Sequence, residues 1–252
     1  MYKRQHQIFA LDEPTSILIT VLYIFVCVNA INLIDGLDGL AAGVVGIGSL
    51  AMFVYTYLLA YQQQFVVATT ASLVTATIAG ICAGFLPHNF FRAKMFMGDS
   101  GAMLLGLLLA CSTLSLTGQI DSSALTPSRG DALPALLPIV LPIAIMALPL
   151  IDMTMAYIRR TWNGNWWFVA DKKHLHHRLL QRGHSQIKAV LIMYMWTAII
   201  AFGVIALGLA WYWPVILAVA VAIAIAIVLT VVPMRQPKSP ARRLVEPKPV
   251  ER

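Results

Sequence analysis

Two long stretches of this chain contain no charged side chain. One runs for 53 residues from Gly39 to Phe91, and the other for 46 residues from Ala189 to Met234. A helix needs roughly 20 apolar residues to cross the hydrocarbon core of a bilayer, so each stretch is long enough for two crossings. Only 12% of the 252 residues are charged, about half the share in an ordinary soluble domain. The sequence therefore predicts a polytopic membrane protein.

Seven membrane-spanning helices are expected, and the fold class is all-α. Every backbone polar group must be satisfied inside lipid, which an open sheet edge cannot do. Four prolines in the fifth span predict a kinked or broken helix there. Residues 1–233 are expected to form one transmembrane domain, and residues 234–252 a basic, disordered cytoplasmic tail. The expected spans are approximately 16–33, 40–60, 65–86, 101–117, 133–158, 188–211 and 214–233.

The basic residues indicate which end of the bundle faces the cytoplasm. Of the 18 Lys and Arg residues, 15 lie in the segments 87–100 and 159–188 or in the tail after residue 233. Loops with an excess of Lys and Arg stay in the cytoplasm, so these segments and the turn after the first span are predicted to face it. This orientation puts the basic N-terminus outside, which suggests that the chain begins partway through a longer protein.

The stretch NAINLIDGLDGLAAG places two acids at the cytoplasmic end of the first span. Asn32, Asp35 and Asp38 are spaced i, i+3, i+6, so they line one face of about two turns if the helix continues through them. Carboxylates so placed can coordinate a divalent cation while substrate phosphates complete its shell. The alternative is a helix end with solvated aspartates, which would suit a single Asp better than the pair in D-G-x-D-G.

Two further segments bring polar side chains to the same end. In KMFMGDSG, Asp99 is a candidate metal or substrate ligand, although Asp99 and Ser100 could instead cap the next helix. In DKKHLHHRLLQRGH, His174 and His177 would share one helical face. No cysteine or acid stands there at a spacing typical of zinc sites. Imidazoles beside Lys and Arg favour a phosphate ligand, and an ordinary basic loop is the alternative.

These segments together predict a cytoplasm-facing pocket with carboxylates for Mg²⁺ on one side and basic groups for phosphates on the other. Phosphoryl transfer needs this combination, because charge must be neutralised while the attacking oxygen is positioned. One substrate could be a lipid and the other a soluble nucleotide, and no nucleic-acid partner is expected. Asp152, the remaining acid within a span, either pairs with Arg159 or has a direct role.

Three segments together resemble the signature regions of a known family. NAINLIDGLDGLAAG, PHNFFRAKMFMGDSGAMLLG and DKKHLHHRLL, in this order and spacing, look like those of the polyprenyl-phosphate N-acetylhexosamine-1-phosphate transferases, glycosyltransferase family 4. The resemblance extends to about residue 232. It implies transfer of a sugar 1-phosphate from a UDP-N-acetylhexosamine to polyprenyl phosphate, release of UMP, and a requirement for Mg²⁺ or Mn²⁺. It also implies a multi-pass protein of the bacterial plasma membrane with a cytoplasmic active site.

Within the family, HLHH and NLIDGLDG look like the branch that uses UDP-N-acetylglucosamine. That branch starts the synthesis of teichoic acid, O-antigen, enterobacterial common antigen or arabinogalactan. The peptidoglycan-precursor phospho-N-acetylmuramoyl-pentapeptide transferases are similar but usually have three adjacent histidines. The sequence leaves open which polymer is made, the polyprenyl length, and the oligomeric state, a homodimer included.

The resemblance also implies roles for individual residues. Asp99 matches the metal-binding Asp of the family, and Asp35 is a second candidate metal ligand. The expected catalytic residues are Asp35, Asp38, Asp99 and His174. The expected substrate-binding residues are Asn32, Asn89, Phe96, Arg160, His176 and His177.

Two departures from the family pattern affect this interpretation. Arg92 stands where the family commonly has Pro. The family also has an acidic D-D-x-x-D/N motif in an earlier cytoplasmic loop, a candidate base or nucleophile. The pair Asp12–Glu13 cannot replace it, since it is expected outside. Family members have ten or eleven spans, so this chain is expected to correspond to their C-terminal two thirds and to be inactive or strongly impaired alone.

Three other interpretations remain. An intramembrane aspartyl protease would use G-x-G-D, whereas Phe96 stands three residues before Asp99. A transporter of an anion would have charges near the bilayer midplane, whereas these acids lie at span ends. A non-catalytic remnant of the transferase fold stays open because the earlier acidic motif is missing. Metal-dependent release of UMP would separate the transferase from all three.

Overall fold

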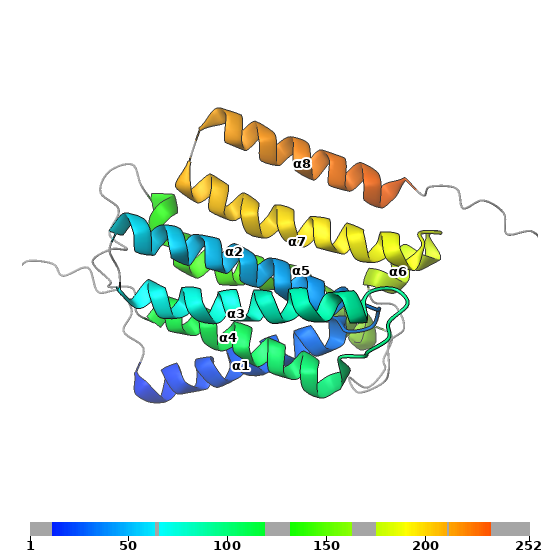
Figure 1. The fold of residues 1–252 in the computed structure, drawn as a ribbon, viewed down its shortest axis with the longest axis horizontal. Coiled ribbons are helices and arrows are strands. Elements are labelled where there is room, and N and C mark those ends of the chain that lie inside the picture. Colours follow the sequence, from blue (N-terminus) through cyan, green and yellow to red (C-terminus); the bar gives the residue numbers. More distant parts are fainter. Residues whose placement is uncertain (1–11, 64–65, 119–131, 163–174, 211, 233–252) are drawn as a thin grey trace, which may run out of the picture.

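The computed structural model describes residues 12–63, 66–118, 132–162, 175–210 and 212–232. Within these ranges the secondary structure is entirely helical, and all helices except the short α6 run side by side as a bundle (Figure 1). The helices are α1 (Glu13–Ile34), α2 (Leu40–Gln63), α3 (Val66–Asn89), α4 (Gly98–Gly118), α5 (Ala132–Trp162), α6 (Leu175–Gln181), α7 (Gln186–Leu209) and α8 (Trp213–Val231).

Seven of the helices in the described ranges are long and apolar enough to cross a membrane. They correspond one to one to the seven expected spans, so the predicted all-α, polytopic class is confirmed. The helix bounds differ from the expected ones by a few residues. The difference matters most at α4, which begins at Gly98, so Asp99 lies in its first turn rather than in the preceding loop.

The fifth span was expected to be kinked or broken; it is not broken, and the kink stays a prediction. α5 is one continuous helix of 31 residues, although Pro134, Pro138, Pro142 and Pro149 all lie within it. Proline removes a backbone hydrogen bond and crowds the preceding turn. Membrane helices tolerate this, because neighbouring helices and small local adjustments satisfy the freed carbonyl groups. α5 has such neighbours, since it packs against both α7 and α1.

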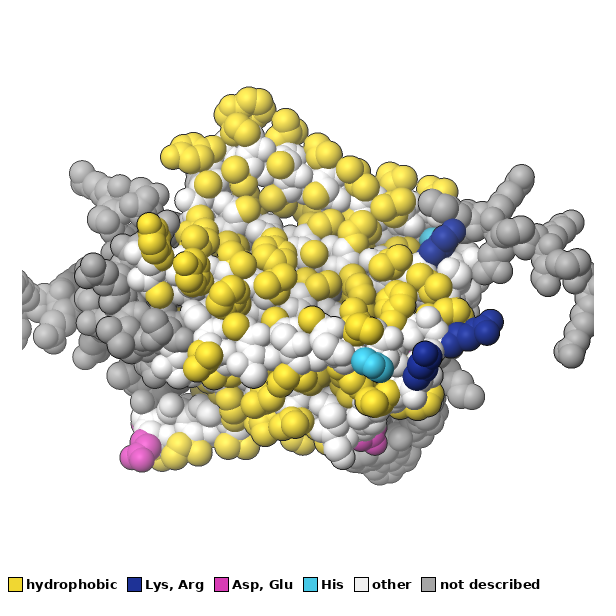
Figure 2. Space-filling view, in the orientation of Figure 1, with side chains coloured by type: hydrophobic (Ala, Val, Ile, Leu, Met, Phe, Trp, Pro, Cys, Tyr) yellow, Lys and Arg dark blue, Asp and Glu magenta, His cyan; other side chains and the backbone are white. Residues whose placement is uncertain are grey.

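The described basic residues all lie at one end of the bundle. Every Lys or Arg in the described part of the chain falls within 92–94, 159–160 or 178–188. Figure 2 shows Lys and Arg at the end where α6 lies, while hydrophobic side chains cover the flank between the two ends. This distribution agrees with the orientation expected from the sequence, in which that end faces the cytoplasm.

α1 and α4 approach closely because Gly106 has no side chain. A Cβ atom at Gly106 would lie 2.9 Å from the Cα of Val28 and 3.2 Å from the carbonyl oxygen of Cys27. The two helices run in opposite directions, so the end of α1 and the start of α4 meet at the same end of the bundle (Figure 1). Asp35 and Asp99 each lie seven residues from this contact, which is about two helical turns.

An apolar cluster of buried side chains supports that end of the bundle. It draws residues from α1, α2, α5, α6 and α7, so five helices share one base beneath the polar segments. Its larger members are Ile34, Leu40, Val44, Leu148, Leu179, Val190, Ile192 and Met193. Burial of each such side chain contributes about 1.5–3 kcal/mol in water-soluble proteins, and here the same packing fixes the short helix α6 to the bundle.

Candidate active site

The link between α1 and α2 is a tight turn, which we call the acidic turn (residues 35–39). α1 ends at Ile34, and the N–H of Asp35 donates a hydrogen bond to the carbonyl oxygen of Asn32. The expectation that a continuing helix would line up Asn32, Asp35 and Asp38 is therefore wrong. Gly39 ends the turn with φ +78°, a left-handed conformation that glycine adopts without the steric cost of a Cβ.

Asn89 joins the acidic turn to the loop between α3 and α4. Its side chain is 3% exposed. Its Oδ1 accepts a hydrogen bond of 3.0 Å from the N–H of Gly39, and its Nδ2 donates one of 2.9 Å to the carbonyl oxygen of Met95. Asn89, expected to bind substrate, thus has a structural role in the described contacts. Its expected contact with a nucleotide remains a prediction.

Asp38 of the acidic turn also contacts the loop between α3 and α4. Its Oδ2 accepts a hydrogen bond of 3.2 Å from the N–H of Ala93. The loop is also held by the carbonyl oxygen of His88, which accepts from the N–H groups of Lys94 and Met95 at 2.8 and 3.1 Å. The acidic turn and the α3–α4 loop therefore form one hydrogen-bonded unit in front of α4.

Asp35 follows the last residue of α1 and Asp99 lies in the first turn of α4, so both carboxyl groups lie at the same end of the bundle. Burial raises the pKa of the half-buried Asp35 carboxyl above its ordinary value of 3.8, and the charge of Asp99 raises this pKa further. Asp99 itself is exposed in the first turn of α4, directly after Gly98, whose φ is +67°. Two like charges that repel each other at one place favour a cation, because it relieves the repulsion.

Binding of Mg²⁺ at this pair of carboxylates stays a prediction. Among the described residues, no group of three or more His, Cys, Asp or Glu is arranged to hold a metal ion. Mg²⁺ usually takes one or two carboxylates and completes its shell with water and substrate phosphates. Asn32 adds a buried Oδ1 with no hydrogen-bond partner in the described part of the chain, and such an amide oxygen is a suitable hard ligand.

The histidine segment is anchored by an acid whose partner the sequence did not reveal. Asp152 on α5 is 3% exposed, and its Oδ1 accepts a hydrogen bond of 2.6 Å from the N–H of Leu175, the first residue of α6. His176 and His177 belong to α6, but their side chains lie outside the described part of the structure. His174 lies outside the described residues altogether.

The remaining expected residues lie near the same end with different surroundings. Phe96, in the α3–α4 loop, is 77% exposed, so its ring is free to contact a ligand. Arg160, in the last turn of α5, places its guanidinium carbon 5.7 Å from the centre of the Tyr157 ring. These positions agree with a binding surface but do not test the expected roles.

Tyr194 on α7 is a contact that the sequence gave no reason to expect. Its hydroxyl donates a hydrogen bond to the carbonyl oxygen of Gly39, so α7 helps to fix the acidic turn. The two residues are 155 positions apart, and a tyrosine within an apolar span shows no pattern that would indicate this partner. Only its polar group within a membrane helix could have drawn attention to it.

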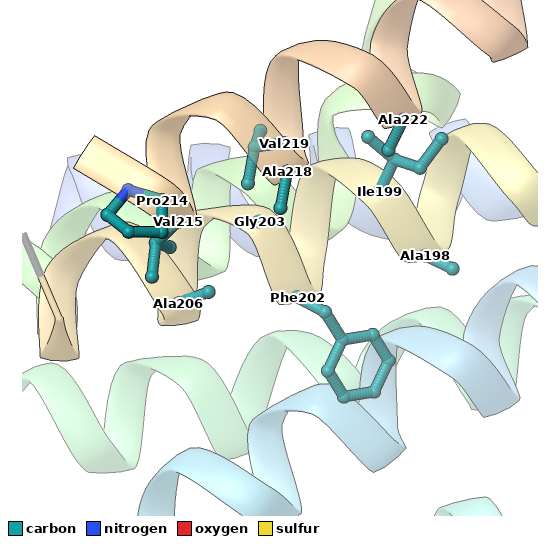
Figure 3. A pocket seen from close by; sticks show the side chains of 10 residues that line it. All are labelled: Ala198, Ile199, Phe202, Gly203, Ala206, Pro214, Val215, Ala218, Val219 and Ala222. Carbon is teal, nitrogen blue, oxygen red and sulfur yellow. The ribbon is translucent and has the colours of Figure 1, made fainter. Parts of the chain in front are cut away.

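Two cavities lie between α7 and α8, apart from the acidic turn. A groove of about 540 Å³ runs between α7 and α8, and only apolar side chains and a glycine line it (Figure 3). A smaller cavity of about 180 Å³ lies towards the basic end of the same helices, beside His184 and Lys188. Neither of these two cavities is lined by any of the expected site residues.

Comparison with known proteins identifies the family that this chain resembles. Residues 3–117 match the model of glycosyl transferase family 4. The chain is 46% identical, over 194 residues, to decaprenyl-phosphate N-acetylglucosaminephosphotransferase of Mycobacterium tuberculosis (strain ATCC 25618 / H37Rv), covering 77% of this chain and 48% of that protein.

Two further relatives come from other bacteria. The identity to a probable undecaprenyl-phosphate N-acetylglucosaminyl 1-phosphate transferase of Bacillus subtilis (strain 168) is 38% over 197 residues, 77% of this chain and 49% of the relative. The identity to a phospho-N-acetylmuramoyl-pentapeptide-transferase of Synechococcus sp. is 34% over 185 residues, 73% and 46% of the two chains. The chain spans about half the length of the curated relatives that it matches. The resemblance of this chain to glycosyl transferase family 4 is therefore confirmed.

Proposed function

We propose that this protein takes part in transferring N-acetylglucosamine 1-phosphate from UDP-N-acetylglucosamine to polyprenyl phosphate at the cytoplasmic face of a bacterial membrane. The relatives with 46% and 38% identity are named for transfer of this sugar phosphate to decaprenyl and undecaprenyl phosphate. Relatives named for the muramoyl-pentapeptide reaction are 34% identical over 185 residues, or 42% identical over 97 residues, which is only 38% of this chain. The product would be the first lipid-linked intermediate of an envelope polysaccharide.

The proposed reaction exchanges one phosphoanhydride bond for another. An oxygen of polyprenyl phosphate attacks the β-phosphorus of UDP-N-acetylglucosamine. A new P–O–P bond forms to the lipid phosphate, the bond between the β-phosphorus and the bridging oxygen breaks, and UMP leaves with that oxygen. Four negative phosphoryl oxygens or more gather at one place in this step, so catalysis depends on positioning and on neutralising charge.

The residues of this chain have separate roles in the proposal. Asp35, Asp99 and the Oδ1 of Asn32 would hold Mg²⁺, which when bound would neutralise charge on the diphosphate. Asp38 and Asn89 keep the α3–α4 loop against the acidic turn, so Phe96 stays at the edge of the site. Arg160, with His174, His176 and His177, would bind the phosphates from the side of α5 and α6.

The observation that supports the proposal most is that Asp35 and Asp99 lie at the same end of the bundle, where α1 ends and α4 begins. They lie 64 positions apart in the sequence, the charge of Asp99 raises the pKa of Asp35, and the described Lys and Arg lie at the same end. Carboxylates together with basic groups are what a metal–diphosphate complex needs.

Release of UMP tests the proposal. The 252-residue chain and the same chain extended upstream in its gene would each be purified in detergent with Mg²⁺, polyprenyl phosphate and UDP-N-acetylglucosamine. Asp99→Asn removes a proposed metal ligand, while Glu13→Gln removes a carboxylate from the other end of α1. UMP release that Asp99→Asn abolishes and Glu13→Gln preserves supports the proposal.

The controls separate the alternatives. UDP-N-acetylmuramoyl-pentapeptide as the only productive donor would favour the peptidoglycan-precursor reaction instead. Activity that appears only in the extended chain agrees with the expectation that an earlier acidic motif is needed. No UMP from either chain, with either donor, would refute the proposed function and favour a remnant or a transporter.

A further inference from the structure

The acidic turn is held by a hydrogen bond between Tyr194 of α7 and Gly39, the last residue of the turn. The hydroxyl group of Tyr194 donates this hydrogen bond to the carbonyl oxygen of Gly39. The same oxygen accepts the N–H of Gly43 at 3.0 Å, which is the first hydrogen bond of α2. A carbonyl oxygen has two lone pairs, so Tyr194 and Gly43 together satisfy this acceptor completely.

The position of Tyr194 depends on a missing side chain. A Cβ atom at Gly43 would lie 1.9 Å from the Cζ of Tyr194 and 2.1 Å from its hydroxyl oxygen. Real Cβ atoms essentially never approach so closely, so the ring can hold this position against α2 only when residue 43 is glycine. The first turn of α2 is therefore shaped for this one tyrosine.

Gly39 is fixed at both of its peptide groups. Its N–H is bound by Asn89 from α3, and its carbonyl oxygen is bound by Tyr194 from α7. Gly39 is also the residue with a positive φ that ends the acidic turn. Glycine loses the most backbone freedom on ordering, so two side chains that hold it reduce the motion of the acids that precede it.

We propose that Tyr194 is a positioning residue for the active site, and that it acts by locking Gly39 and thereby the carboxylates of Asp35 and Asp38. Tyr194 lies within α7, and its hydroxyl group is hydrogen-bonded to the backbone of Gly39. In the proposal, Tyr194 therefore does not itself contact substrate or metal. Its kinetic consequence rests on the proposed function, whereas its effect on the turn does not.

Hydrogen–deuterium exchange of the segment 35–43 tests the lock directly. Tyr194→Phe keeps the ring against Gly43 and removes only the hydroxyl. Loss of one hydrogen bond of ordinary net strength corresponds to about a 3- to 10-fold change in an opening equilibrium, so deuterium uptake in this segment should rise by about that factor. Gly43→Ala, which displaces the ring, should have the same effect, and adding Tyr194→Phe to it should change uptake no further.

Matched controls exclude a general loosening of the bundle. Tyr23→Phe removes another half-buried hydroxyl, which shares a hydrogen bond of 2.8 Å with Thr113 between α1 and α4. Gly80→Ala adds a Cβ where no atom lies within 4 Å. Both controls should leave uptake in 35–43 unchanged. Unchanged uptake in Tyr194→Phe would overturn the proposal.

The functional half of the proposal has its own measurement. In the form of the protein that releases UMP, Tyr194→Phe should lower kcat by about 3- to 10-fold and raise the Mg²⁺ concentration for half-maximal rate, while Tyr23→Phe should change neither. Raised uptake with unchanged kinetics would overturn the positioning role. If uptake rises in Tyr194→Phe while the wild-type protein neither binds UDP-N-acetylglucosamine nor releases UMP, the proposed function is refuted and the effect of Tyr194 on the turn is supported.

Discussion

The close contact between α1 and α4 gives a direct test of how the two acids are brought together. The change Gly106→Ala adds one methyl group at the crossing. Its Cβ would lie 2.9 Å from the Cα of Val28, whereas carbon atoms in contact are about 3.5–4.0 Å apart. The obstacle is backbone, which cannot rotate away as a side chain can, so the helices must separate by at least about 0.5 Å.

The expected cost follows from the packing. Adding a methylene group to a well-packed interior costs about 1–3 kcal/mol. Alanine is also a better helix former than glycine by about 1 kcal/mol, so the reference must contain the same exchange. Gly80→Ala supplies it, because its Cβ meets no atom within 4 Å. Gly106→Ala should therefore be about 1–3 kcal/mol less stable than Gly80→Ala.

Thermal unfolding in detergent measures this difference. A domain of this size changes its Tm by about 2–4 °C per kcal/mol, so Gly106→Ala should melt about 2–12 °C below Gly80→Ala. A thiol-reactive dye can report unfolding, because Cys27 and Cys82 are buried in the native bundle. Equal melting temperatures for the two variants would refute the argument that this contact sets the distance between α1 and α4.

Three further predictions concern the site. The change Asp99→Asn removes the charge of Asp99, so the pKa of Asp35, measured by NMR, should fall, while burial keeps that pKa above 3.8. A carboxyl group whose pKa is raised by folding makes the protein less stable as the pH rises through that pKa. In Asp99→Asn, this loss of stability should therefore occur at lower pH. Asn89→Ala should cost about 2–4 kcal/mol in thermal unfolding, because the Gly39 N–H and the Met95 carbonyl lose their partners; an unchanged Tm would contradict this role. Asp152→Ala should expose the segment around α6 to proteolysis, whereas Asp152→Asn, which retains Oδ1, should protect it.

The spans could be predicted because hydrophobic length is a property of sequence alone. Bounds were accurate to a few residues, since charged and polar residues end each apolar stretch. The prolines of α5 misled the prediction, because the cost of proline in a helix is defined for helices in water. In the bundle, neighbours of α5 and the absence of competing water keep it continuous.

The site could be predicted as a set of residues but not as a geometry. Asp35, Asp38 and Asp99 stood out because acids at span ends are rare. Their arrangement depends on where α1 ends, and that is decided by Gly39 and by partners such as Asn89, which is 50 positions away. Contacts of this kind leave no periodic pattern, so the role of Tyr194 and the hydrogen bond that Leu175 of α6 donates to Asp152 could only be found in the structure.

Binding of Mn²⁺ to the 252-residue chain, followed by electron paramagnetic resonance with UDP-N-acetylglucosamine present, tests the central claim most directly, because it needs no turnover. If Asp35 and Asp99 hold one divalent cation with the nucleotide, then Asp35→Asn and Asp99→Asn should each lower Mn²⁺ affinity by at least about 10-fold, and Glu13→Gln should bind like the wild type. Equal Mn²⁺ affinity in Asp99→Asn and the wild type would contradict the account.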